Sequence, residues 1–132
     1  MAAWRGSQAT VFMAGALISL FAYPAQHSAI ERAGGELVEK TIMPGKMHEE
    51  CLLVRANQQL HYEFDASVDV EFNVHYHDVT LGRIIYLFGP SLVGSTPDMK
   101  GYRVQESQVL CLMWNNTHAE AIRLEYSLGV SQ

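Results

Sequence analysis

Three histidines in the middle of the chain are the residues best suited to holding a transition metal. One residue separates His75 from His77, and both would project from the same face of a β-strand, because side chains alternate along a strand. His61 lies on the outward face of the preceding segment. If the two segments pair as a hairpin, the three imidazoles fall within one patch. Neutral imidazole is a ligand of copper and zinc, so His61, His75 and His77 are the candidate metal ligands.

Metal binding is nevertheless the less favoured of two interpretations of these residues. A closed zinc site needs four ligands in tetrahedral geometry, and the three histidines supply fewer. Cys111 and Met113 share a face of a later segment and would add sulfur ligands for copper. A cysteine within a disulfide is not such a ligand. A His-x-His pair on an exposed strand is more often solvated and hydrogen-bonded.

Carboxylate and amide side chains on the same polar faces are candidate binding residues. Glu71 and Asn73 share the face of His75, and Glu63 shares the face of His61. Glu63 and Glu71 would be needed together in a glycosidase, but carboxylates on a polar sheet face usually point into solvent. The serine and aspartate residues form no nucleophile elbow or triad motif. We therefore predict a binding protein and not an enzyme.

Residues 1–29 have the composition of an export signal. Arg5 is the only charge before Glu31, and an apolar stretch runs from Ala9 to Ala22, about the length of a signal hydrophobic region. A membrane anchor needs roughly 20 apolar residues, so cleavage is favoured over an uncleaved anchor. We expect a periplasmic or secreted protein, or a lumenal one in a eukaryote, with no membrane contact beyond this segment.

Composition and charge restrict the partners of the chain. The 132 residues fit one domain. Nine Lys and Arg against fourteen Asp and Glu give a formal net charge of −5, which disfavours nucleic acid and anionic lipid because both attract basic surfaces. The apolar content of 48% excludes a disordered tail. The expected partner is a protein or a small ligand.

Cys51 and Cys111 are the only cysteines of the chain. Export would place them in a compartment where disulfides form and persist. The loop closed by such a bond is long, and its stabilisation by chain entropy is about 4 kcal/mol. Two buried free thiols or a metal site are the alternatives.

Alternation of apolar and polar residues predicts an all-β domain. Residues 60–64 and residues 70–76 each place apolar side chains at every second position, with a break at Ala66-Ser67 between them. The glycines and prolines of residues 89–100 predict a loop. Further strands are expected at 36–43, 51–55, 83–88, 109–114 and 121–128. Seven to eight short strands predict an antiparallel β-sandwich over residues 36–130, preceded by a signal helix.

A series of short motifs follows in a characteristic order over residues 37–128. In chain order they are Pro44-Gly45, Glu49-Glu50-Cys51, Leu60-x-Tyr62-x-Phe64, Asp69-Val70-x-Phe72-Asn73-Val74, Gly101-Tyr102, Val109-Leu110-Cys111-Leu112 and Asn115. This order resembles the GOLD domain, the lumenal, jelly-roll-like β-sandwich of Golgi-dynamics cargo receptors. In those receptors a Cys after a Pro-Gly-Glu-rich turn pairs with a Cys in a late strand, and Cys51 and Cys111 occupy the matching positions.

The sequence also departs from the receptor pattern. The receptors continue into a coiled coil, a membrane helix and a cytoplasmic tail, which this sequence does not contain, and the segments 75–78 and 111–114 are not part of the usual pattern. The resemblance therefore implies a stand-alone exported GOLD-like protein that binds partners, and not cargo transport. The function expected from the sequence is an exported, disulfide-stabilised, non-enzymatic binding module. The alternative is an extracytoplasmic copper- or zinc-binding protein.

Overall fold

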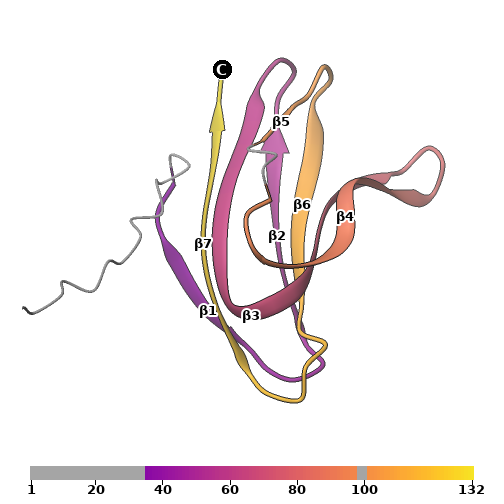
Figure 1. Cartoon of the computed structure of the whole chain (residues 1–132). Coiled ribbons are helices and arrows are strands. Elements are labelled where there is room, and N and C mark those ends of the chain that lie inside the picture. The colour runs from indigo at the N-terminus through magenta and orange to yellow at the C-terminus, as the bar shows by residue number, and fades with distance from the viewer. Residues whose placement is uncertain (1–34, 98–100) are drawn as a thin grey trace, which may run out of the picture.

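The computed structural model describes residues 35–97 and 101–132, which form a single curled antiparallel sheet (Figure 1). Its strands are β1 (Val38–Ile42), β2 (Met47–Val54), β3 (Gln59–Asp78), β4 (Arg83–Ser95), β5 (Tyr102–Arg103), β6 (Gln108–Asn115) and β7 (Ile122–Ser131). The prediction of an all-β, antiparallel fold of seven to eight strands is confirmed, with seven strands in the described residues. The predicted signal helix falls on residues 1–29, outside the described residues. No helix in the described part is long and apolar enough to cross a membrane.

The 20-residue strand β3 connects the two halves of the sheet. Its first half, residues 59–66, pairs with β7, and its second half, residues 71–75, pairs with β6. Both halves also pair with β4, so β6 and β7 must follow one another along the opposite edge of β3. Between the halves the register with β4 shifts, from Asp65 to Val70. The sheet bends there, and β3 curves from β7 toward β6 in Figure 1.

This bend folds one sheet into a sandwich-like core. Even-numbered residues of β3 point inward on both sides of the bend, because the bend does not change the alternation. The ring of Phe72 lies 4.6 Å from that of Phe64, across the bend, and 5.5 Å from that of Trp114 on β6. Trp114 in turn lies 5.0 Å from Tyr126 on β7. All four aromatic side chains are almost fully buried, so the two halves of the sheet are held together by aromatic packing.

Two expected breaks in the strands are wrong. The break expected at Ala66-Ser67 lies inside β3, and the loop expected over residues 89–100 is instead strand β4 as far as Ser95. Gly89, at φ 68°, sits where β4 has one residue more than β3, and the pairing continues after this bulge. A Cβ atom at Gly89 would lie 2.4 Å from the carbonyl oxygen of Phe72. Glycine therefore marks a close backbone contact here and not the end of a strand.

A disulfide joins Cys51 to Cys111. The two residues face each other in the register of β2 and β6, with their Cα atoms 4.1 Å apart. Among the described strands, β2 pairs with β6 alone, so the bond fastens an outer strand to the sheet. An eight-residue β2–β6 ladder surrounds the bond.

We expect the double variant Cys51→Ala/Cys111→Ala to keep the fold and lose stability. The bond closes a loop of 60 residues. Without the bond the unfolded chain gains conformational entropy, which lowers the free energy of unfolding by about 2–4 kcal/mol. Urea unfolding followed by circular dichroism would show a lower midpoint with the β-sheet spectrum retained. A midpoint equal to that of the oxidised wild type would show that the bond contributes nothing.

Candidate functional site

The candidate site lies on the side of the sheet that points away from the hydrophobic core. We call this surface of β2, β6, β3 and β4 the outer face. Residues directly opposite one another in antiparallel strands share a face. His75 pairs with Cys111 on one side and with Tyr86 on the other, and Cys111 pairs with Cys51. Cys51, Cys111, His75 and Tyr86 therefore form one row across four strands.

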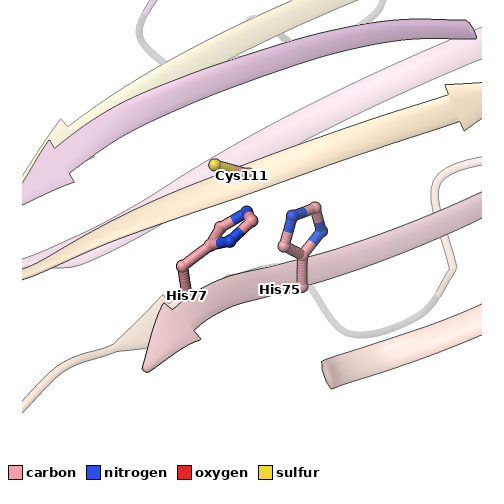
Figure 2. Close-up of side chains that lie close together, drawn as sticks. All are labelled: His75, His77 and Cys111. Atoms are coloured by element: carbon pink, nitrogen blue, oxygen red, sulfur yellow. The ribbon is translucent and has the colours of Figure 1, made fainter. Parts of the chain in front are cut away.

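The structure brings His75 and His77 together with the disulfide. One possible ligand atom from each of His75, His77 and Cys111 lies within 4.8 Å of the other two (Figure 2). The imidazole centroids of His75 and His77 are 5.2 Å apart. The two histidines share a face as their spacing predicts, and the β3–β6 register supplies the sulfur.

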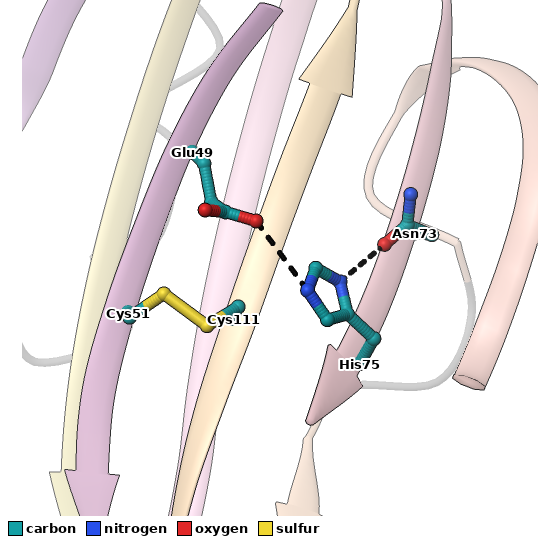
Figure 3. Close-up of a disulfide and its surroundings, with 5 residues drawn as sticks. All are labelled: Glu49, Cys51, Asn73, His75 and Cys111. Atoms are coloured by element: carbon teal, nitrogen blue, oxygen red, sulfur yellow. Dashed lines mark hydrogen bonds and ion pairs between the residues drawn. A yellow bond between two sulfur atoms is a disulfide. The ribbon is translucent and has the colours of Figure 1, made fainter. Parts of the chain in front are cut away.

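Asn73 and Glu49 hold the ring of His75 from two sides (Figure 3). Nδ1 of His75 lies 2.7 Å from Oδ1 of Asn73, and Nε2 lies 3.4 Å from a carboxylate oxygen of Glu49. An amide oxygen only accepts hydrogen bonds, so Nδ1 carries the proton and donates it. The Nε2 atom then faces the carboxylate and the strands that carry the disulfide.

The centre of the outer face is buried, although this side of the sheet points away from the hydrophobic core. His75 is 3% exposed, Cys111 is 3% exposed and Asn73 is fully buried. Burial lowers the pKa of His75, and the neighbouring His77 lowers it further, while Glu49 raises it. A neutral His75 with its proton on Nδ1 presents a lone pair at Nε2 to the Glu49 carboxylate. The ring is thus held from both sides, with its Nε2 atom beside the Glu49 carboxylate.

Asn73 and Glu71, two of the predicted binding residues, lie on the same face of β3 as His75. The Nδ2 atom of Asn73 is buried and has no hydrogen-bond partner among the described residues. Glu71 lies two positions before Asn73 on the same face and accepts a hydrogen bond of 3.1 Å from Nδ2 of Asn115. Asn73 and Glu71 therefore extend the polar part of the outer face along β3.

His61 and Glu63 lie apart from this cluster. The two segments that carry the histidines are parts of one strand, so they do not form the hairpin that would bring His61 to His75 and His77. His61 pairs with β7 instead, and its Nε2 atom lies 2.6 Å from the hydroxyl of Ser131. Glu63 lies opposite Ser127 on the same strand β7. The structure therefore does not assemble the three-histidine ligand set.

Exposed apolar side chains surround the polar centre of the outer face. Six of them are between 44% and 61% exposed: Met47, Leu53, Ile84, Tyr86, Leu92 and Val109. Each belongs to the outer face by its register with a neighbouring strand. A groove of about 760 Å³ begins at Leu53, Val109 and His77 and extends to the β3–β4 turn.

Glu49 is a residue of this cluster that is not among the site residues predicted from the sequence. The available signal was its spacing, because Glu49 and Cys51 are two residues apart and so share a face of a strand. Its contact with His75 depends on the order β2–β6–β3 in the sheet, which alternation within one strand does not contain.

A second polar group, on the inner side of β2, was also not anticipated. The Tyr126 hydroxyl donates to a carboxylate oxygen of Glu50 at 2.7 Å and lies 2.9 Å from Nε2 of His48. A phenol has one proton to donate, so it accepts from His48. The ring of His48 also stacks on Trp114. This network ties β2 to β7 across the core and so supports the strand that carries Glu49 and Cys51.

No family model matches the sequence, and no curated protein matches it. Solved structures that are similar to part of it include a designed protein and a natural one. A de novo designed double-stranded β-helix shares 17% identity over 71% of this chain and 99% of its own, with a TM-score of 0.40. PliG of Aeromonas hydrophila, a periplasmic inhibitor of g-type lysozyme, shares 11% identity over 73% of this chain and 89% of its own, with a TM-score of 0.37.

We expect His48 to make the folded chain less stable in mild acid. Burial lowers the pKa of His48 below its ordinary value of 6.5, Lys40 lowers it further, and Glu50 opposes both. Below about pH 6.5 the unfolded chain therefore takes up a proton at His48 that the folded chain resists, and stability falls with pH. His48→Gln keeps a donor for Tyr126 and removes this titration.

Urea unfolding of the wild type and the His48→Gln variant at about pH 7.5 and about pH 5.5 measures the effect. The wild type should lose more of its unfolding free energy between the two values than the variant does. Equal losses in the two proteins would show that His48 is not the group responsible.

Proposed function

We propose that this chain is an exported, non-enzymatic binding module that binds a protein partner through the outer face of β2, β6, β3 and β4. The observation that carries the proposal is the set of six large apolar side chains exposed together on this one face. Large exposed apolar side chains gathered on one face of a small protein mark an interaction site. Tyr86 adds an aromatic side chain, a type that is enriched at interface centres.

Several features support a location outside the cytoplasm. The disulfide between Cys51 and Cys111 is of a kind that persists in oxidising compartments. The composition of residues 1–29 is that of an export signal. The resemblance to GOLD domains, which rests on motif order and cysteine placement, implies the same habit of extracytoplasmic protein binding and belongs to this proposal.

Charge and shape define the partner further. The net charge of −5 does not favour nucleic acid or an anionic membrane. Met47 and Leu53 stand at the two ends of the outer face of β2, six residues and about 20 Å apart. Only Leu53 borders the groove. A protein would contact both ends of the face, whereas a small ligand in the groove would contact one.

This difference provides the test. We expect a partner captured by the chain from the extracytoplasmic fraction, and then purified, to bind the wild type in calorimetry. Met47→Ala and Leu53→Ala should each weaken its binding by about tenfold, the effect of losing an apolar contact worth about 1.4 kcal/mol. Val130→Ala, an exposed apolar residue on β7, is the matched control and should bind as the wild type does.

The other outcomes contradict the proposal. A loss of affinity in Leu53→Ala alone would indicate a small ligand in the groove. Equal affinity in all three variants would place the partner on another surface of the chain.

A further inference from the structure

The disulfide is surrounded by side chains that bind transition metals. His75 and His77 each offer a ligand atom within 4.8 Å of the Cys111 sulfur. Glu49 offers a carboxylate oxygen within the same distance of the sulfurs of Cys51 and Cys111. Sulfur, nitrogen and oxygen donors from three adjacent strands therefore converge on one point of the outer face (Figures 2 and 3).

In the oxidised chain this cluster lacks the donors for a closed site. Both sulfurs are bonded to each other, and the thiolate is the form of cysteine that binds a metal. The two imidazoles alone fall short of the four ligands of a structural zinc site. Reduction would change the set to two thiolates and two imidazoles, the combination typical of tetrahedral zinc.

We propose that reduction of the Cys51–Cys111 disulfide opens a zinc site formed by Cys51, Cys111, His75 and His77. The bond would be reduced by a dithiol. One of its thiolates attacks the sulfur of Cys51, and the Cys111 thiolate leaves. The second dithiol sulfur then releases Cys51 and forms the disulfide of the oxidised reductant. Zinc binding displaces the thiol protons to solvent, and the ion holds both sulfurs as thiolates.

The exposure of the two cysteines fits this sequence of steps. Cys51 is exposed and Cys111 is 3% exposed. A reductant therefore reaches the Cys51 sulfur from solvent, and the leaving sulfur is the one beside His75 and His77.

The backbone needed for the site is already in place. The β2–β6 ladder pairs eight residues on each strand, and β6 pairs with β3 at His75. These backbone pairings hold the four Cα atoms of the site without the disulfide. His75, His77 and Cys111 already place ligand atoms within 4.8 Å of one another. Release of Cys51 from the disulfide frees its side chain to rotate to the fourth position of a tetrahedral zinc ion.

Asn73 prepares His75 for this role. It accepts the Nδ1 proton at 2.7 Å, which fixes the tautomer and leaves Nε2 as the ligand atom. Metal-binding histidines usually have such a partner on their other nitrogen. Burial is also compatible, because two thiolates balance the charge of the zinc ion. The carboxylate of Glu49, 3.4 Å from Nε2, adds negative charge beside the ion. Asn73 is thus a positioning residue.

The experiment is titration of the full chain with zinc alone, using a chromophoric chelator as competitor. The chain is titrated oxidised, and again after reduction with a phosphine in the absence of oxygen. We expect one equivalent of zinc in the reduced chain and none in the oxidised chain. Cobalt(II) in place of zinc should give the spectrum of tetrahedral coordination with thiolate ligands.

Variants assign the ligands. His75→Ala and His77→Ala should each weaken zinc binding by tenfold or more, and Asn73→Ala by about tenfold through the loss of ring orientation. His61→Ala and His118→Ala remove histidines on other parts of the surface and should bind as the wild type does. His75→Cys keeps a ligand at position 75 and should restore the affinity that His75→Ala loses, which separates ligation from loss of fold.

Three results would overturn the proposal. One is a reduced chain that binds no zinc although its circular dichroism spectrum is unchanged. A second is equal binding by the oxidised chain. The third is binding by the reduced chain that is the same in His75→Ala and His77→Ala, since two thiolates alone would then hold the ion.

Discussion

The bend in β3 is the constraint on which the rest of the structure depends. One strand of 20 residues pairs with β7 before the bend and with β6 after it. The alternation of inward and outward side chains continues through the bend, so apolar residues face the core in both halves. The same alternation puts Glu71, Asn73, His75 and His77 on the outer face. A shift of one residue at the bend would send these polar side chains into the core and expose Phe72 and Val74.

Much of this arrangement could be predicted from the sequence. The period-2 pattern of residues 60–64 and 70–76 gives both the strands and the faces, because burial of one face imposes that period. The pairing of Cys51 with Cys111 follows from the cysteine count and the expected compartment.

The remainder depends on which strands become neighbours, and alternation within a strand does not contain that information. Ala66-Ser67 resembles a turn in composition, yet the chain continues through it as strand, and Ala66 pairs with Leu124 of β7. The prediction that His61 joins His75 requires a hairpin, and the continuous β3 separates the two residues. Glu49 joins His75 only because β6 lies between β2 and β3. The chemistry of the residues was therefore recognisable, but their grouping was set by tertiary pairing.

The outer face combines two properties that rarely occur together, an exposed apolar surface and a buried polar centre. Both depend on the row in which Cys51, Cys111, His75 and Tyr86 are neighbours across four strands. Nuclear Overhauser effects in the oxidised chain test this row most directly. The account predicts cross-peaks from the ring protons of His75 to the β protons of Cys111 and to the ring of Tyr86. Cross-peaks between the rings of His61 and His75 would contradict it, because they require the hairpin that the continuous β3 excludes.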